Sequence, residues 1–277
     1  MTHFITWIFI LLIPVLGGFI YGFERVVRAR MQNRQGPPIL QPFYDMYKLL
    51  DKQPFMVNSY HIVFALVHMI VLWIAVAMVV LGFNLLYIIF IHLTASIFLV
   101  LAGYSVKSVY SHIGSNRELM TIVAYEPVLI LIAVGFYMVN GTFDTSAVWN
   151  SGSNLLSMIP LFLALLLITP IKLKKSPFDA AEAHQEIVGG IEIEYSGVFF
   201  EILYMAKWIE YMFIYSLVFL FAGENWLLGL LLAAFVFLIV NLVDNSTARI
   251  KTTQLVKITL SIGVTLGVLN IIGLHYV

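Results

Sequence analysis

Side chains that could move protons are concentrated between Lys172 and Glu210 of this 277-residue chain. This stretch holds nearly half of the chain's 15 acidic residues, although only 11% of all residues are charged. Its first part, up to Glu194, is too polar to lie in hydrocarbon. Its second part is apolar but carries Glu201 and Lys207, and a charge at the centre of a membrane costs roughly 2.5–3.5 kcal/mol on insertion scales. We therefore expect an ion or proton path that begins in a carboxylate-lined loop and continues into the bilayer.

The candidate pathway residues combine loop carboxylates with ionisable side chains inside apolar segments. They are Asp179, Glu182, Glu186 and Glu194 in the loop, and Glu126, Glu201, Lys207 and Glu210 in the apolar segments. Glu126 precedes Pro127, and a proline inside a membrane helix frees backbone groups where it lines a cavity. These residues also have purely structural explanations, which stay open. Glu126 could lie at the membrane interface, Lys207 and Glu210, three residues apart, could form a buried ion pair, and the loop carboxylates could simply be solvated.

The elements that must position these side chains are membrane helices. With 61% apolar residues and a mean hydropathy of +0.95, the chain is too apolar for a soluble domain. Runs of about 20 apolar residues are each long enough to span roughly 30 Å of hydrocarbon. We predict an all-α polytopic membrane protein with one domain over residues 1–277. Its eight spans are expected at about 4–23, 60–82, 84–106, 120–139, 155–172, 196–221, 226–243 and 256–275, the first being a retained helix and not a signal peptide.

The basic residues predict the orientation of these spans. Fourteen of the fifteen Lys and Arg residues lie in alternating connections, and Lys207 is the exception. By the positive-inside rule, the odd-numbered connections are cytoplasmic and both termini lie outside a cell membrane. An odd number of spans would break this pattern, so the charges favour eight.

The first connection is expected to contain a helix lying at the membrane surface. Gly36-Pro37-Pro38 breaks the chain, and apolar residues then recur at three- and four-residue spacing, which predicts an amphipathic helix at about 38–52. This helix could be a lipid-associated linker, or it could form one wall of a docking surface. The candidate docking residues of the first and last basic connections are Arg25, Arg28, Arg30, Arg34, Asp45, Lys48, Arg249 and Lys251.

Several functions are excluded or disfavoured by what the sequence lacks. There is no cysteine, which excludes disulfides, Cys-ligated iron–sulfur clusters and covalently attached haem on this chain. The net charge is zero, and no nucleotide-binding glycine motif or nucleophile elbow is present. His68 and His92 lie in separate spans, where packed or hydrogen-bonded histidines are a better interpretation than haem ligands. We expect no metal or cofactor on this chain, so any redox centre belongs to a partner.

Motifs along the whole chain resemble the subunit 1 family of respiratory complex I and its hydrogenase relatives. The first loop is similar in Glu24-Arg25, Arg30-Met31-Gln32, Arg34 and Gly36-Pro37, followed by Pro42, Asp45 and Lys48. The family's signature loop is similar to Ser176-Pro177-Phe178-Asp179, Glu182-Ala183, Glu186, Gly189 and Glu194-Tyr195-Ser196-Gly197. Tyr125-Glu126 resembles the pair in the family's fourth helix, and Arg249, Gln254 and Lys257 resemble residues of its last cytoplasmic loop.

Departures from the complex I pattern indicate a branch of this family. Complex I members usually have asparagine at the position of Pro38 and glutamate at that of Lys207, whereas Thr247-Ala248-Arg249 is more similar to energy-converting, Ech-type NiFe hydrogenases. The resemblance implies a subunit that couples ferredoxin-linked hydrogen evolution to proton or sodium translocation. It also implies partners: a NiFe large subunit, an iron–sulfur small subunit, a ferredoxin-like subunit and an antiporter-like membrane subunit, with the NiFe centre and 4Fe–4S clusters on these partners.

Two other functions remain open at this point. One is a quinone-site subunit of a complex I-like NADH or ferredoxin:quinone oxidoreductase, in which the acidic loop and the surface helix would line a quinone chamber. The other is a passive membrane anchor, in which the charges only hold a cytoplasmic enzyme in place.

Overall fold

The computed structural model describes the backbone of residues 2–276 and the side chains of residues 6–276. Within this range the chain forms no strand, apart from one isolated β-bridge between Asn84 and Asp144, so the predicted all-α class is confirmed. The elements are α1 (Thr2–Met31), α2 (Gln41–Leu50), α3 (Ser59–Leu81), α4 (Leu85–Tyr104), α5 (Val109–Asn140), α6 (Thr145–Trp149), α7 (Ile159–Lys172), η1 (Ala180–Glu182), α8 (His184–Ile187), η2 (Gly190–Glu194), α9 (Val198–Leu220), α10 (Trp226–Ser246), α11 (Thr252–Ile258), the π-helical η3 (Thr259–Val264) and α12 (Thr265–His275).

Seven of the described helices are long and apolar enough to cross a membrane, which confirms a multi-pass membrane protein. They are α1, α3, α4, α5, α9, α10 and the continuous helix Thr252–His275 formed by α11, η3 and α12. The predicted span at 155–172 is shorter than expected. It is α7, whose 14 residues extend about 21 Å. Pro160 lies in its first turn, where proline favours the start of a helix.

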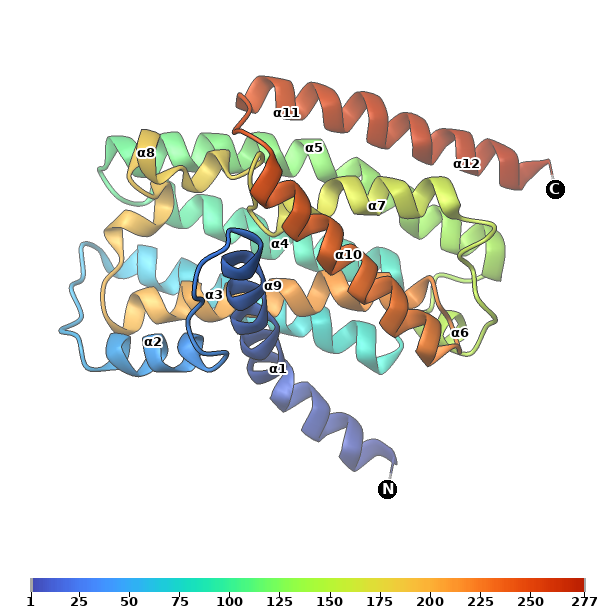
Figure 1. The fold of residues 1–277 in the computed structure, drawn as a ribbon, viewed down its shortest axis with the longest axis horizontal. Coiled ribbons are helices and arrows are strands. Elements are labelled where there is room, and N and C mark those ends of the chain that lie inside the picture. The colour runs from blue at the N-terminus through green and yellow to red at the C-terminus, as the bar shows by residue number, and fades with distance from the viewer. Residues whose placement is uncertain (1, 277) are drawn as a thin grey trace.

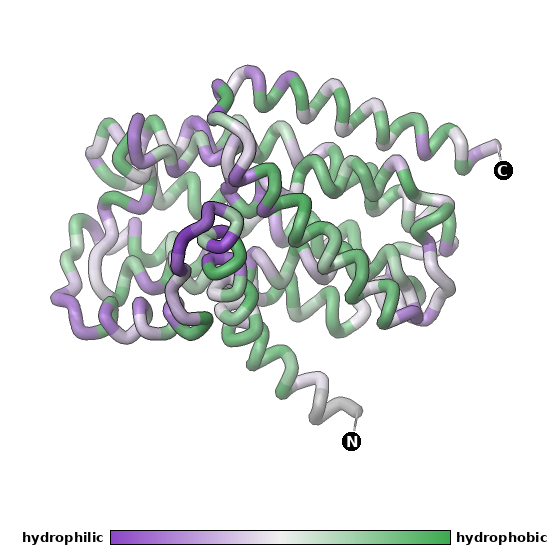
Figure 2. Tube along the Cα trace, in the orientation of Figure 1, coloured by the Kyte–Doolittle hydropathy of each residue, from purple (hydrophilic) through white to green (hydrophobic). Residues whose placement is uncertain are grey.

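The helices pack into a bundle whose long members are crossed obliquely by α1 and α10, as Figure 1 shows. α9 packs against α1 and α3, α5 packs against α4 and α7, and α12 lies along α5 and α7. Large buried side chains, among them Trp208, Tyr125 and Phe136, fill the interior. Hydrophobic residues cover most of the helices, and hydrophilic residues gather in the connections (Figure 2). α7 lies inside the bundle, so its lysine-rich C-terminal end enters the protein interior.

The connections form two separate groups. Odd-numbered connections contact one another: the Ser176 amide donates to Asp244, and Gln32 donates to Asn245. Even-numbered connections also contact one another, through the Asn84–Asp144 bridge and the bond from the Asn154 amide to the carbonyl of residue 221. This grouping agrees with the alternation of charge in the sequence. That the basic group faces the cytoplasm stays a prediction.

The surface helix predicted at about 38–52 corresponds to α2, which is shorter by a few residues at its N-terminal end. The non-helical segment at Gly36–Pro38 is followed by a turn before α2 begins. Phe43 packs on α9, with its ring centroid 5.3 Å from that of Trp208. Asp45 accepts a 2.7 Å hydrogen bond from Arg25 of α1. α2 is therefore fixed to α1 and α9 by both apolar and ionic contacts.

Candidate functional site

The acidic loop folds back over one end of the bundle between α7 and α9. It contains the three short helices η1, α8 and η2, which pack against α5. Gly189 and Gly190 have φ values of 104° and 62°, a region of backbone conformation that favours glycine. A side chain on Gly190 would meet the carbonyl oxygen of Ala181, and Gly114 of α5 lies directly against Gly190. The glycines thus allow the loop to lie close to α5 and bring its carboxylates inward.

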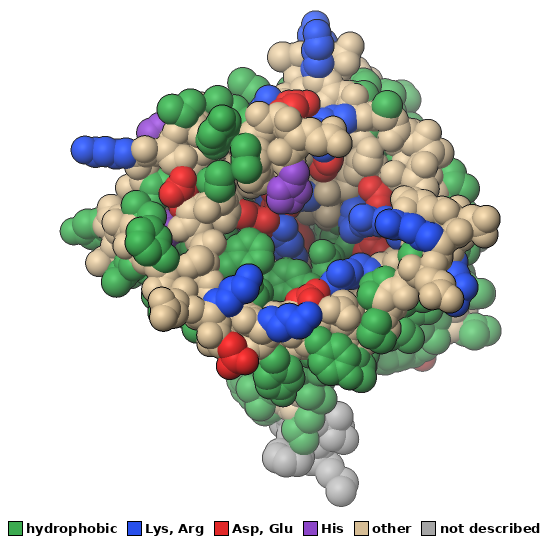
Figure 3. Space-filling view, turned by 60° about the vertical axis from the view of Figure 1, so that its left-hand side comes forward, with side chains coloured by type: hydrophobic (Ala, Val, Ile, Leu, Met, Phe, Trp, Pro, Cys, Tyr) green, Lys and Arg blue, Asp and Glu red, His purple; other side chains and the backbone are tan. Residues whose placement is uncertain are grey.

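A cavity of about 270 Å³ lies between this loop and α1, α4, α5, α7 and α9. Figure 3 shows a hollow in this face of the molecule with acidic, basic and histidine side chains around it. Much of the lining is supplied by charged residues from the loop and the helices, together with a histidine from the loop. These residues are Arg28, Glu118, Lys172, Lys174, Lys175, Asp179, Glu182, His184, Glu192, Lys207 and Glu210. Its walls are therefore much more polar than the interior of the bundle.

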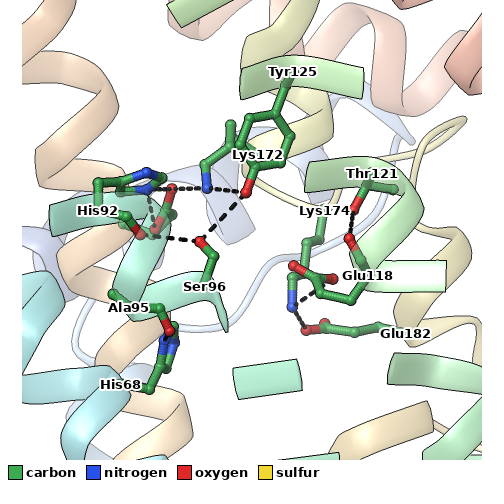
Figure 4. Close-up of polar contacts among 11 residues, drawn as sticks. His68, His92, Ala95, Ser96, Glu118, Thr121, Tyr125, Lys172, Lys174 and Glu182 are labelled. Carbon is green, nitrogen blue, oxygen red and sulfur yellow. Dashed lines mark hydrogen bonds and ion pairs between the residues drawn. The ribbon is translucent and has the colours of Figure 1, made fainter. Parts of the chain in front are cut away.

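Five of these residues form what we call the outer cluster: Glu118, Lys174, Glu182, Glu192 and Lys207. The Lys174 ammonium lies 2.6 Å from Glu182 Oε1 and 3.5 Å from Glu118 Oε2. The Lys207 ammonium lies 2.7 Å from Glu182 Oε2 and 2.6 Å from Glu192 Oε1. Figure 4 shows Lys174 between Glu118 and Glu182. The outer cluster therefore joins α5, the loop and α9 through two lysines.

Burial and ion pairing act in opposite directions on the loop carboxylates of the outer cluster. Burial by itself would raise the pKa of Glu182, but the charges of Lys174 and Lys207 outweigh it and hold that pKa well below its usual range. Burial, and after it the charge of Glu182, raise the pKa of Glu192. Two neighbouring carboxylates therefore differ in how readily they accept a proton.

Deeper in the bundle lies the inner cluster, formed by Lys172, Glu210 and His92 with Tyr125. The Lys172 ammonium is 2.9 Å from Glu210 Oε1 and donates a 3.1 Å hydrogen bond to the Tyr125 hydroxyl. His92 Nε2 lies 3.1 Å from the same Glu210 oxygen. Figure 4 shows Lys172 directed toward Tyr125 and His92. The Lys172 and Glu210 side chains are only 5% and 13% exposed, so this ion pair is almost entirely removed from solvent.

A third set of charges connects the acidic loop to α1 and α10. Lys175 lies 2.6 Å from Glu24 Oε1, and Glu24 also accepts a hydrogen bond from the Tyr211 hydroxyl. Arg28 Nε lies 2.9 Å from Asp244 Oδ2. Burial lowers the pKa of Lys175, and the charge of Glu24 opposes this effect. Lys175 thus anchors the start of the loop to α1, the Arg28–Asp244 pair joins α1 to α10, and the Ser176 amide bonds the loop to Asp244.

The outer part of the loop is held by two arginines, Arg117 of α5 and Arg249 of the connection between α10 and α11. Arg249 makes a two-pronged contact with Asp179, at 2.7 Å and 2.6 Å, and lies 3.7 Å from Glu186. Arg117 pairs with Glu186 at 2.6 Å and donates a 2.9 Å hydrogen bond to the Ala180 carbonyl. Hydrogen bonding to Asp179 raises the pKa of Arg249. Arg249 therefore pairs the last basic loop with the acidic loop.

Two predicted pathway carboxylates are buried without any hydrogen-bond partner among the described residues. Glu126 of α5 is 6% exposed and Glu201 of α9 is 5% exposed, and both oxygens of each side chain lack a partner. Neither side chain lines the cavity. α5 continues as a helix through Pro127, directly after Glu126. Both residues are therefore buried inside the bundle and make no hydrogen bond to either cluster within the described residues.

The buried ion pair considered for Lys207 and Glu210 does not form. Lys207 pairs with Glu182 and Glu192 of the loop, whereas Glu210 pairs with Lys172 and His92. The two side chains lie at different depths on α9, and each meets a stronger partner from another element. The Glu194 side chain makes no hydrogen bond or ion pair within the described part of the chain, so it joins neither cluster.

The predicted docking residues fall into two groups. Arg25, Arg28, Asp45 and Arg249 make ion pairs within the chain. The other four are exposed: Arg30, Arg34, Lys48 and Lys251. Only the second group is free in this respect to contact another molecule.

The candidate list drawn from the sequence leaves out many of the residues that build the site, although Glu24 and Tyr125 belong to motifs of the family resemblance. The residues left out are Glu24, His92, Arg117, Glu118, Tyr125, Lys172, Lys174, Lys175, Glu192, Tyr211 and Asp244. A signal existed for three of them, because Lys172, Lys174 and Lys175 directly precede the acidic loop and end a wholly apolar helix. The partner of Glu210, by contrast, depends on packing between α4, α7 and α9.

The two histidines considered as haem ligands, His68 and His92, have other partners in the structure. No group of three or more His, Asp or Glu side chains in the described part of the chain is arranged to hold a metal ion. His68 Nδ1 lies 2.7 Å from the carbonyl of Ala95, and His92 pairs with Glu210 and stacks on Phe213. Both histidines are thus hydrogen-bonded, as expected.

Comparison with known proteins places the chain among respiratory membrane proteins. The family model described as "NADHdh: NADH dehydrogenase" matches residues 4–275. Formate hydrogenlyase subunit 4 of Escherichia coli (strain K12) is 33% identical over 270 residues, covering 86% of this chain and 88% of that protein. NADH-ubiquinone oxidoreductase chain 1 of Patiria pectinifera is 34% identical over 223 residues, covering 73% of this chain and 68% of that protein.

A solved structure has the same fold. It is a chain of the membrane-bound sulfane sulfur reductase, described as an archaeal respiratory membrane complex. The TM-score is 0.88 at 21% identity, and the match covers 97% of this chain and 98% of that one. The architecture of α1 to α12 is therefore shared with a subunit of a respiratory complex.

Proposed function

Since this chain belongs to the NADH dehydrogenase family, which includes complex I subunit 1 and is represented in membrane subunits of oxidoreductase complexes, we propose that it is the coupling subunit of an energy-converting NiFe hydrogenase. In this role it docks the iron–sulfur and NiFe subunits and couples ferredoxin-linked hydrogen evolution to proton or sodium translocation. Similarity to formate hydrogenlyase subunit 4 over most of both chains supports the hydrogenase branch.

The observation that carries this proposal is the series of buried charges that runs from the loop into the bundle. The outer cluster and the inner cluster line one cavity, and Glu182, Lys207 and Glu210 are members of both the lining and the ion pairs. Buried ion pairs are costly to form and seldom add net stability, so a series of them inside a membrane protein supports a functional explanation.

Charge that arrives on a docked partner would act first on the loop. Buried or paired carboxylates respond strongly to a nearby charge, and neighbouring sites titrate together. A reduced cluster above the loop would favour protonation of the outer cluster, and the change would pass by way of Lys207 on α9 to Glu210 and the inner cluster. Glu126 and Glu201 are the proposed continuation inside the bundle, toward an antiporter-like neighbour.

The four exposed cations are the proposed contacts for the peripheral subunits. Arg30, Arg34, Lys48 and Lys251 make no ion pair within the described residues and belong to the odd-numbered connections. Arg25, Arg28 and Arg249 act differently in this proposal, because their internal pairs hold α2, α10 and the loop in position. They shape the docking surface without being free to bind a partner.

A second candidate is the quinone-reducing role, which the similarity to NADH-ubiquinone oxidoreductase chain 1 favours. In that case the cavity would hold a quinone head group and the loop would form part of its chamber. The density of charge in the lining is the argument against a neutral, apolar ligand there.

The test is to purify the complex containing this chain in mild detergent. Hydrogen evolution from reduced ferredoxin is measured beside quinone reduction, with nickel content and subunit masses from the same sample. We expect hydrogen, stoichiometric nickel and no quinone reduction. Quinone reduction without nickel would establish the second candidate. Unchanged ion transport and assembly in Glu126→Gln and Glu201→Gln variants would instead support a passive anchor.

A further inference from the structure

The charges of the outer cluster do not balance. Glu118, Glu182 and Glu192 face only two ammonium groups, those of Lys174 and Lys207. All five side chains line the cavity, and the three carboxylate side chains are only 9–15% exposed. With every group ionised, one negative charge would lack compensation in a space with little solvent. A buried carboxylate in that position favours the protonated form.

The geometry distinguishes Glu192 from its neighbour Glu182. Each oxygen of Glu182 contacts a different lysine, Lys174 at 2.6 Å and Lys207 at 2.7 Å, so it is well compensated as an anion. Glu192 has a single ion pair, at 2.6 Å, and shares that lysine with Glu182. Neutralising Glu192 leaves Lys207 paired with Glu182, whereas neutralising Glu182 takes one partner from each of two lysines.

The surroundings of Glu192 come from several elements. η1 contributes Glu182, the start of the loop contributes Lys174, α5 contributes Glu118 and α9 contributes Lys207. α8 contributes His184 to the same cavity wall. Burial and the Glu182 charge raise the pKa of Glu192, and the two lysines oppose this. This direction agrees with the geometric argument.

We propose that Glu192 takes up one proton from the cavity and releases it in each reaction cycle, while Lys207 remains charged and bound to Glu182. The proton adds to a carboxylate oxygen of Glu192, which becomes a neutral carboxylic acid. Release of the proton restores the contact of Lys207 with both carboxylates. This role rests on the proposed coupling function and assigns its proton-loading step to one side chain.

Infrared difference spectroscopy of the intact, purified complex at two pH values tests this assignment. We expect the wild type to show the C=O stretch of a titrating carboxylic acid, the Glu192→Gln variant to lack it, and the Glu224→Gln control to retain it. The control residue is exposed in an even-numbered connection and does not line the cavity. A band that persists unchanged in Glu192→Gln would overturn the proposal.

Two further variants keep the test decisive. If Glu192→Gln does not assemble, Glu192→Asp must shift the band, and an unshifted band would overturn the assignment. Lys207→Gln should allow protonation at about tenfold lower proton concentration, because Glu192 loses its one ion-pair partner among the described residues. The infrared signal does not depend on hydrogen evolution. If the wild-type complex evolves no hydrogen but the band is lost in Glu192→Gln, the proposed function is refuted and the proton site at Glu192 is supported.

Discussion

The ion pair between Lys172 and Glu210 gives a quantitative test of the inner cluster. The two charged groups are 2.9 Å apart and almost fully buried. At an effective dielectric constant of about 20, a pair at this distance has a Coulomb energy of about 6 kcal/mol, most of which offsets the cost of removing both charges from water. Removing one partner should therefore cost about 3–5 kcal/mol, because the other charge is left buried.

The two single substitutions should not be equivalent. After Lys172→Met, Glu210 still has His92 at 3.1 Å, and that imidazole is able to accept a proton and become a cation. After Glu210→Gln, Lys172 loses its one ion-pair partner among the described residues and keeps the Tyr125 hydroxyl and the face of the Tyr125 ring, 4.2 Å from its centroid. We expect the Glu210→Gln loss near the upper end of that 3–5 kcal/mol range and the Lys172→Met loss near its lower end.

A double-mutant cycle measures the coupling directly. The free energy of unfolding is obtained from equilibrium denaturation in mixed micelles for the wild type, both single variants and Lys172→Met/Glu210→Gln. We expect the double variant to lose about 2–3 kcal/mol less free energy of unfolding than the two single losses add up to. Glu224→Gln, at an exposed position in an even-numbered connection, serves as control and should change stability by less than about 0.5 kcal/mol. Single losses that add within about 0.5 kcal/mol would refute the buried pair.

Two other predictions concern packing and pH. Gly17→Ala should lower the free energy of unfolding by about 1–3 kcal/mol, because its new methyl group would overlap the Trp208 carbonyl where α1 meets α9. Gly273→Ala, with open space around it, should leave stability unchanged. Equal thermal stability of the two variants would contradict the close approach of α1 and α9. The folded-state pKa of Glu182 lies below its unfolded value of about 4.3, so its stabilising contribution is fully present above that pH and lost as the pH falls through the folded-state pKa. The difference in melting temperature between wild type and Glu182→Gln should therefore stay constant from neutral pH down to about pH 5 and shrink in more acidic buffer. A difference that disappears as the pH falls from 7 to 6 would contradict the pairing of Glu182 with its two lysines.

Local patterns in the sequence were sufficient to predict most of the helices. Apolar runs identify the long spans, and three- and four-residue spacing after Gly36-Pro37-Pro38 identifies α2. The burial of Glu126 and Glu201 also follows from their positions within apolar segments. These features depend on neighbouring residues, which is why the sequence alone reveals them.

The ion pairs of the site depend on packing between distant segments. His92 and Glu210 are separated by 118 residues, and Lys207 and Glu182 by 25. Spacing along one helix suggested that Lys207 and Glu210 could pair, but the loop brings two carboxylates to Lys207 and α7 brings Lys172 to Glu210. The folded-back loop creates these partners, and no periodic pattern within α9 could indicate them.

The central claim is that the buried charges of this chain couple electron transfer to ion movement. The most direct measurement is the number of ions translocated per hydrogen molecule by the intact complex in proteoliposomes, for the wild type and for Glu126→Gln, Glu201→Gln and Glu224→Gln. Glu126 and Glu201 have no hydrogen-bond partner among the described residues, so an amide of the same size removes no contact seen in the structure. We predict that translocation is lost in the first two variants while most of the hydrogen evolution remains, and that both activities are unchanged in the third. Equal loss of translocation and hydrogen evolution in fully assembled Glu126→Gln and Glu201→Gln complexes would contradict the account.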